Sequence, residues 1–163
     1  EFRRVLFRSE VYDESHEPHA IHSRKEETLR DILEEIGNEN VLIYYQYDYE
    51  RELLMLNHGC ELLDTPERWN NGYIKRACAN PATLGYGTNI QKGGHIIIWY
   101  SLPLSYEQYA QACKRLHRQG QRETVKIIHL ISRNTVEEII YNMLKQEKAV
   151  LLENLMEYHK INI

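Results

Sequence analysis

The sequence has few cysteines and no long apolar run. Its three cysteines, Cys60, Cys78 and Cys113, are odd in number and form no CxxC pair, which argues against a disulfide framework and a zinc site and suits a reducing cytoplasm. The longest apolar run, residues 96–100, is far shorter than the ~18 residues of a membrane span. The N-terminal EFRRVLFRS has too short an apolar stretch for a signal peptide. We therefore expect a cytoplasmic protein without a membrane partner.

The sequence also lacks the motifs that bind the phosphates of ATP. It contains no Gly-x-x-x-x-Gly-Lys-Ser/Thr loop, and no Asp-Glu-x-His/Asp box follows a predicted strand. Those elements hold the phosphates and Mg²⁺ in enzymes that hydrolyse nucleotides. His16, His19 and His22 lie near acidic residues, but their spacing matches no standard metal cluster. We interpret them as part of a solvated segment and predict no metal site.

The overall charge does not indicate a nucleic-acid partner, because the net charge is −4 and the pI is about 6.1. Positive charge is concentrated between residues 111 and 126. Five cations lie there against one carboxylate, Glu123, and the local charge is therefore five minus one, or +4; the cations are Lys114, Arg115, Arg118, Arg122 and Lys126. A partner that carries phosphate is expected to bind in this segment.

Helical and strand patterns alternate along the chain. Helical patterns cover residues 25–36, 50–56, a short segment from 65, 105–120 and 135–158, and strand patterns cover 41–45, 60–63, 74–78, 95–100 and 125–131. Ser105 with Gln108, and Thr135 with Glu138, are capping boxes that mark helix starts. The alternation predicts an α/β fold with a central, mostly parallel sheet and helices on both faces.

The length of 163 residues and the 42% hydrophobic content predict one domain with a full core. We assign this domain to residues 20–163 and expect it to end in a long helix. Residues 1–19 are expected to be flexible. Within them, residues 1–9 show no periodicity, and we treat them as a non-native remnant outside the fold.

The loop at residues 82–91 is the first candidate for a binding function. It follows the predicted strand 74–78 and contains Gly85 and Gly87, and glycines let the backbone approach a ligand closely. Ligands of open parallel sheets bind beyond the carboxyl ends of the strands, so a loop in this place is expected to carry function. A lone Gly-x-Gly is weak evidence, however, and an ordinary tight loop explains it equally well.

The second candidate is the basic segment. Gln111, Arg115 and Arg118 are spaced at i, i+4 and i+7, which places them on one face of the predicted helix. Arginine binds phosphate oxygens in a bidentate manner and stays charged, so this face suits a polyphosphate. The alternative is a solvated basic face. Gly120 predicts the end of the helix.

In this order, the two segments resemble motifs V and VI of superfamily-two helicases, in the Swi/Snf-like branch that includes chromatin remodellers and many phage helicases. Residues 85–91 resemble motif V, and the pattern Gln-x-x-x-Arg-x-His-Arg-x-Gly-Gln at 111–121 resembles motif VI. Residues 69–72, Trp-Asn-Asn-Gly, resemble the phage members in particular. The sequence departs from the family pattern at Thr88 and Leu104, where the family has leucine or isoleucine and often tryptophan.

The resemblance, which covers about residues 20–150, implies a RecA-like three-layer sandwich. This fold would be the second, C-terminal motor lobe of an ATP-dependent DNA helicase or translocase. Arg118 would be the arginine finger that reaches the γ-phosphate of ATP, Arg115 would be a second phosphate contact, and Gln111 would orient these groups or the attacking water. Six further positions would bind ligands: Gly85, Gly87 and Asn89 the nucleotide, and Thr83, Tyr47 and Lys114 the DNA.

The resemblance also implies the cofactor and the partners. ATP with Mg²⁺ would be bound mainly by a first RecA-like lobe that this chain lacks, so the chain alone is predicted to be inactive. Its partners would be DNA and that first lobe, in a monomeric protein in the cytoplasm of a bacterial host, encoded by a phage or prophage. The alternative is a non-catalytic nucleic-acid-binding or protein-docking module on the same scaffold, because fold alone does not establish function. Such a module would tolerate replacement of Arg115 or Arg118.

Overall fold

The computed structural model describes residues 2–8, 19–84 and 88–146. These residues form a six-stranded sheet in the order β1-β6-β5-β2-β4-β3, and every neighbouring pair is parallel. The strands are β1 (Phe2–Arg8), β2 (Val41–Tyr44), β3 (Glu61–Leu62), β4 (Arg76–Ala79), β5 (Ile96–Trp99) and β6 (Lys126–Arg133). The helices are α1 (His19–Ile36), α2 (Asp48–His58), α3 (Pro66–Asn70), α4 (Tyr106–Lys114) and α5 (Val136–Lys145). The predicted α/β architecture is therefore confirmed.

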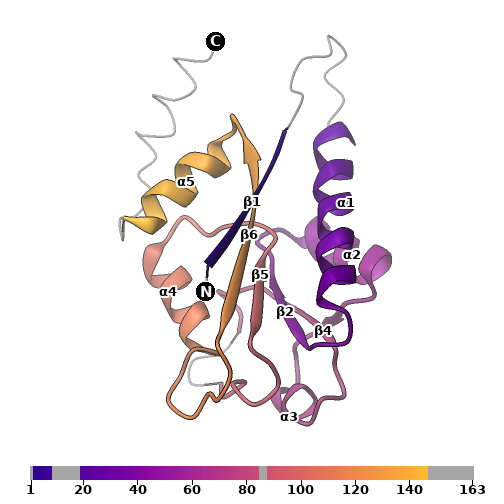
Figure 1. Ribbon diagram of the computed structural model, residues 1–163, viewed down its shortest axis with the longest axis vertical. Coiled ribbons are helices and arrows are strands. Elements are labelled where there is room, and N and C mark those ends of the chain that lie inside the picture. Colours follow the sequence, from indigo (N-terminus) through magenta and orange to yellow (C-terminus); the bar gives the residue numbers. More distant parts are fainter. Residues whose placement is uncertain (1, 9–18, 85–87, 147–163) are drawn as a thin grey trace.

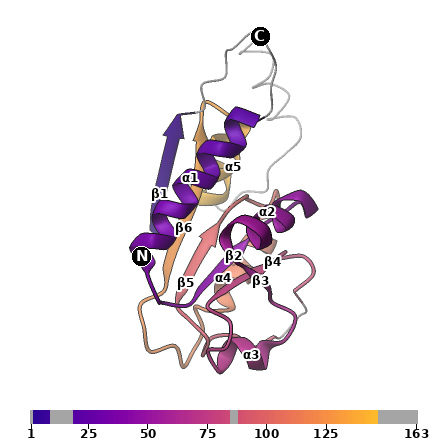
Figure 2. The same cartoon turned by 90° about the vertical axis from the view of Figure 1, so that its right-hand side faces the viewer.

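Helices cover both faces of the sheet, with α1 and α2 on one face and α4 and α5 on the other (Figures 1 and 2). The burial pattern follows from the alternation of side chains along each strand. Val41 and Ile43 of β2 belong to the core under α1 and α2, which includes Leu29. Leu42 and Tyr44 belong to the opposite core, under α4 and α5. The central strands are thus buried on both faces, as their continuous apolar runs predicted.

The helices α4 and α5 begin at the predicted capping residues, but the hydrogen bonds at the start of α5 differ from those predicted. The Ser105 hydroxyl accepts a hydrogen bond from the Gln108 backbone N–H at 3.3 Å, which confirms Ser105 as the N-cap of α4 and provides one of the two hydrogen bonds of the predicted capping box. The Thr135 hydroxyl instead accepts from the backbone N–H of Glu137, while the Glu138 carboxylate accepts from the backbone N–H of Asn134. The helix α5 that begins there is described to Lys145, and its predicted continuation towards residue 158 lies outside the described residues.

The N-terminal residues correct the sequence-based prediction. Residues Phe2–Arg8 form β1, which pairs with β6 at the edge of the sheet, and α1 begins at His19. An edge strand needs a hydrogen-bonded neighbour on one side only, so a segment without clear periodicity can still form it. The exclusion of residues 2–8 from the fold was therefore wrong, whereas the non-native origin of residues 1–9 stays a prediction. No Asp-Glu-x-His/Asp box was expected after a strand. Residues 13–16, Asp-Glu-Ser-His, match that pattern and follow β1 in the chain, but they lie outside the described residues.

The described residues contain no helix that is long and apolar enough to cross a membrane. Within them, no group of three or more His, Cys, Asp or Glu side chains could hold a metal ion. Cys60, Cys78 and Cys113 are free thiols.

Candidate active site

The arginine-bearing segment is not one continuous helix. The helix α4 ends at Lys114, and the chain then turns until Gly120, whose φ is +99°. Leu116 is fully buried, whereas residues 117–120 are exposed. The prediction that Gln111, Arg115 and Arg118 share one helical face was therefore wrong.

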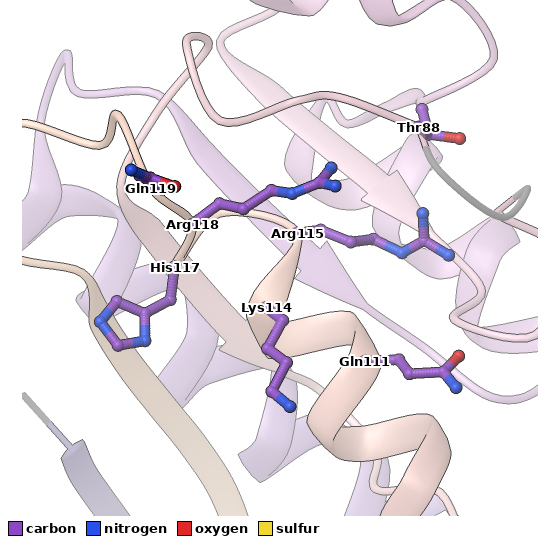
Figure 3. Close-up of a pocket in the computed structure, with 7 residues that line it drawn as sticks. All are labelled: Thr88, Gln111, Lys114, Arg115, His117, Arg118 and Gln119. Carbon is purple, nitrogen blue, oxygen red and sulfur yellow. The ribbon is translucent and has the colours of Figure 1, made fainter.

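A cavity nevertheless brings these three side chains together. It has a volume of about 510 Å³ and is lined by Thr88, Gln111, Lys114, Arg115, His117, Arg118 and Gln119. In Figure 3 the side chains of Gln111, Arg115 and Arg118 extend to the same side, where Thr88 also lies, whereas Lys114 and His117 point away from them. Two guanidiniums and an amide thus face one space, which is the arrangement expected of a polyphosphate site.

The two arginines differ in how they are held. One Nη of Arg115 donates a hydrogen bond to the Leu84 carbonyl at 2.6 Å, so this guanidinium also fixes the loop that follows β4. Arg118 is exposed, and its guanidinium has no hydrogen-bond or ion-pair partner among the described residues. Gln111 donates to the Glu107 carboxylate at 3.0 Å. Of the two arginines, Arg118 is therefore the one that is available to an incoming anion.

Gln121 joins the arginine-bearing segment to the loop before β5. Its Nε2 donates to the carbonyls of Gln91 at 2.9 Å and Gly94 at 3.1 Å. Its Oε1 accepts from the backbone N–H groups of Arg122 and Glu123. Sequence reasoning gave Gln121 no role of its own, because the loops that it joins are distant in the sequence.

We expect Gln121→Ala to lower the free energy of unfolding by about 1–3 kcal/mol, since it leaves the partly buried carbonyls of Gln91 and Gly94 without this donor. Urea denaturation followed by circular dichroism measures this change. Gln119→Ala is the matched control, because Gln119 is exposed in the same turn, and its replacement is expected to change stability by less than about 0.5 kcal/mol. Equal effects of the two variants would contradict the role of Gln121.

Trp69 and Asn70 hold the same loop from its other side. The Trp69 Nε1–H donates to the Ile90 carbonyl at 2.7 Å, and the Asn70 side-chain amide donates to the Asn89 carbonyl at 2.8 Å. Trp69 is fully buried. Trp69 and Asn70 thus stabilise this loop. In the sequence, residues 69–72 were noted only because they resemble the phage members of the family.

Of the three remaining residues predicted to contact the nucleotide, the structure describes one. Gly85 and Gly87 lie outside the described residues. Asn89 is exposed, and its Oδ1 accepts weakly from the Gln91 backbone N–H at 3.4 Å. It does not line the arginine cavity, where the neighbouring Thr88 does.

The predicted DNA contacts do not form one group. Tyr47 precedes α2 and Thr83 lies in the turn after β4, so both are near carboxyl ends of strands. The Asn80 amide donates to the Gln46 carbonyl at 3.1 Å and ties these two loops together. Lys114 instead lines the arginine cavity.

The arginine-bearing segment lies at the end of the sheet where strands β5 and β6 begin, not where they end. It leads into the first residue of β6, where the Lys126 backbone N–H donates to the His95 carbonyl just before β5. In Figure 1 the connection between α4 and β6 lies at the end of the sheet where β5 and β6 begin. The loops of Tyr47 and Thr83 therefore lie at the carboxyl ends of the strands, where ligand-binding groups were expected, whereas the arginines do not.

Comparison with known proteins places these motifs in a family context. No protein-family model matches the sequence. The chain is 32% identical over 140 residues to the putative protein p41 of Acyrthosiphon pisum secondary endosymbiont phage 1, an alignment that covers 80% of this chain and 30% of that protein. It is 37% identical over 99 residues (58% of this chain, 12% of the other) to the SWI/SNF-related matrix-associated actin-dependent regulator of chromatin subfamily A-like protein 1 of Drosophila melanogaster. It is 31% identical over 123 residues (75% and 7%) to the chromatin-remodeling ATPase INO80 of Cryptococcus neoformans.

The chain thus spans less than a third of each of these curated relatives. Among solved structures, the C-terminal part of the Fun30 ATPase domain superposes with a TM-score of 0.70 at 19% identity, over 90% of this chain and 55% of that one. The RecA-like fold is therefore confirmed. The resemblance to the C-terminal lobe of Swi/Snf-like ATPases, predicted from the motifs, is confirmed as well.

Proposed function

We propose that this chain, which resembles the C-terminal RecA-like lobe of Swi/Snf-like ATPases in sequence and fold, is the second motor lobe of an ATP-dependent DNA helicase or translocase. Its cavity would face ATP and Mg²⁺ held by a first RecA-like lobe. The observation that carries this proposal is the pair of arginines in one cavity, of which Arg115 is bound to Leu84 and Arg118 is exposed without a partner among the described residues. We call this chain together with its first lobe the two-lobe protein.

The difference between the arginines suggests a division of roles. Arg118 would act as the arginine finger, because an exposed guanidinium can reach across a cleft and stabilise the charge that develops on the transferred phosphoryl group. Arg115 would contact a second phosphate and keep the loop after β4 in place through the Leu84 carbonyl. Gln111, on the same side of the cavity in Figure 3, would orient these groups or the attacking water. Closure of the two lobes would bring the finger into place, which couples hydrolysis to motion.

The DNA would bind along the carboxyl ends of the strands. Tyr47 is 58% exposed and lies parallel to Tyr49, with 5.7 Å between the ring centroids, and Thr83 is exposed in the loop tied to it. Lys114 lines the arginine cavity, but its side chain points away from the two arginines in Figure 3, and we keep it as a proposed contact to the DNA. The phage relative supports an origin in a phage or prophage, and hence a role in the cytoplasm of a bacterial host.

The test is ATP hydrolysis by this chain alone and by the chain mixed with a separately expressed first lobe, each with and without duplex DNA. We expect no turnover by the chain alone, since its sequence has no Gly-x-x-x-x-Gly-Lys-Ser/Thr loop, and turnover by the mixture. Turnover by the chain alone that is lost in Arg118→Ala would contradict the proposal. DNA binding without turnover in the mixture would favour the docking module.

A further inference from the structure

Glu50 is a buried carboxylate that has no role in the motor function proposed above. It lies in the first turn of α2 and is only 3% exposed. Burial of a charged carboxylate is costly unless donors surround it. Three donors point at its Oε2: the backbone N–H groups of Gln46 (2.9 Å) and Tyr47 (3.2 Å) and the hydroxyl of Ser101 (2.6 Å).

Two of these hydrogen bonds have a local explanation, and the third does not. The bond from the Tyr47 N–H belongs to the capping box of α2, which any helix start can have, and the bond from the Gln46 N–H comes from the adjacent residue. Ser101 is 51 positions away in the sequence and is 6% exposed. It lies between β5 and Ser105, the residue that caps α4. Glu50 therefore joins the loop that carries Tyr47 to the segment that leads into the arginine-bearing helix.

The other end of α4 is also held from β2. The hydroxyl of Tyr44, the last residue of β2, donates to the Ala112 carbonyl at 3.1 Å. Ala112 lies in the last turn of α4, and its carbonyl also accepts the backbone N–H of Arg115, the C-cap residue, at 3.3 Å. Burial raises the pKa of Tyr44 above its ordinary value, so the hydroxyl keeps its proton and remains a donor. One link therefore holds the segment before α4 to the first turn of α2, and the other holds the last turn of α4 to the end of β2.

We propose that Glu50 is a positioning residue that couples DNA at the Tyr47 loop to the placement of the arginines at the end of α4. The inference rests on the proposed motor function. DNA that orders the loop of Gln46 and Tyr47 fixes the Glu50 carboxylate, and the carboxylate fixes Ser101 and the entry to α4. Tyr44 transmits the same constraint to the last turn of the helix. The DNA-bound state then holds Arg115 and Arg118 in a narrower range of positions than the DNA-free state.

The test uses Ser101→Ala in the two-lobe protein, because this variant removes the long-range donor and leaves the capping box of α2 intact. ATP turnover is measured without DNA and with saturating duplex DNA, and the Kd for the same duplex is measured separately. We expect the DNA-stimulated kcat to fall about tenfold, the scale of one lost hydrogen bond to a charged group, while the DNA-free kcat and the Kd stay unchanged. Asp48→Asn is the control, since Asp48 is 84% exposed in the same turn of α2, and it should retain full stimulation.

Three outcomes would overturn the inference. Unchanged stimulation in Ser101→Ala would mean that Glu50 only caps α2. An equal loss of kcat with and without DNA, together with a lower urea midpoint, would mean a general structural role. Loss of DNA affinity would place Ser101 in the binding surface instead. Failure of the proposed function is distinguishable, because the unmodified two-lobe protein would then show no turnover with or without DNA.

Discussion

The Arg118→Ala variant of the two-lobe protein is expected to hydrolyse ATP at least about 10³-fold more slowly than the unmodified protein, as arginine fingers of related nucleotide hydrolases do. This factor corresponds to about 4 kcal/mol of lost transition-state stabilisation. Arg118 is exposed on the cavity wall and has no hydrogen-bond or ion-pair partner among the described residues, so its removal breaks no internal contact there. The measurement is steady-state kcat and KM for ATP at saturating DNA. The loss should be in kcat, because a finger acts mainly in the transition state.

Two further variants separate the finger from simple positive charge. Arg122→Ala removes the same charge from an exposed residue that does not line the cavity, and it should keep nearly the full kcat. Arg118→Lys keeps the charge but not the planar, bidentate guanidinium, and it should be intermediate. If Arg122→Ala and Arg118→Ala lower kcat equally, the effect is one of general electrostatics, and the assignment of Arg118 as the finger is wrong.

Arg115 requires a different treatment, because its guanidinium has a structural partner. Its hydrogen bond to the Leu84 carbonyl is short and partly buried, so replacement would both remove a phosphate contact and release the loop after β4. A loss of activity in Arg115→Ala alone therefore does not assign a catalytic role. The exposed Arg118 gives the cleaner test of the motor hypothesis.

The fold could be predicted from the sequence where local pattern and tertiary packing agree. The continuous apolar runs at 41–45 and 95–100 became the central strands β2 and β5 almost without shift, because strands buried on both faces must be apolar throughout. The end of α4 could not be predicted in this way. The helical spacing continues to Arg118, but α4 ends at Lys114 and the buried Leu116 lies in the turn that follows, a tertiary contact that the local spacing does not show.

The grouping of three candidate side chains could be predicted from the sequence, but the contacts that hold the loops around them could not. The motif pattern identified Gln111, Arg115 and Arg118, and the cavity brings them together despite the broken helix. Gln121 and Trp69 hold the surrounding loops, and no local pattern reveals a hydrogen bond between segments that meet only in the fold. A side-chain amide or an indole N–H finds such a partner only after the strands have set the distance between the loops.

Gly93→Ala is expected to produce the largest loss of stability of any glycine-to-alanine change among the described residues. A Cβ at Gly93 would fall within the Trp69 ring, with contacts to Nε1, Cδ1 and Cε2 far inside the ~3.5 Å at which carbon atoms normally meet. Trp69 is fully buried and cannot swing into solvent without leaving a cavity. Overpacking costs about 1–3 kcal/mol, and loss of the bond from Trp69 Nε1 to the Ile90 carbonyl adds about 1–3 kcal/mol.

We therefore expect Gly93→Ala to lower the free energy of unfolding by roughly 3–5 kcal/mol in urea denaturation. Gly37→Ala is the matched control, since nothing lies within 4 Å of a Cβ there and only its φ of +66° is strained, at a cost of about 1–2 kcal/mol. Trp69→Leu should make the alanine at 93 more tolerable, so the double variant should be less destabilised than the sum of the two single changes. Additive effects, or a Gly93→Ala effect no larger than that of Gly37→Ala, would show that Trp69 is not what requires glycine at this position, and that the loop of Ile90 is held by other contacts.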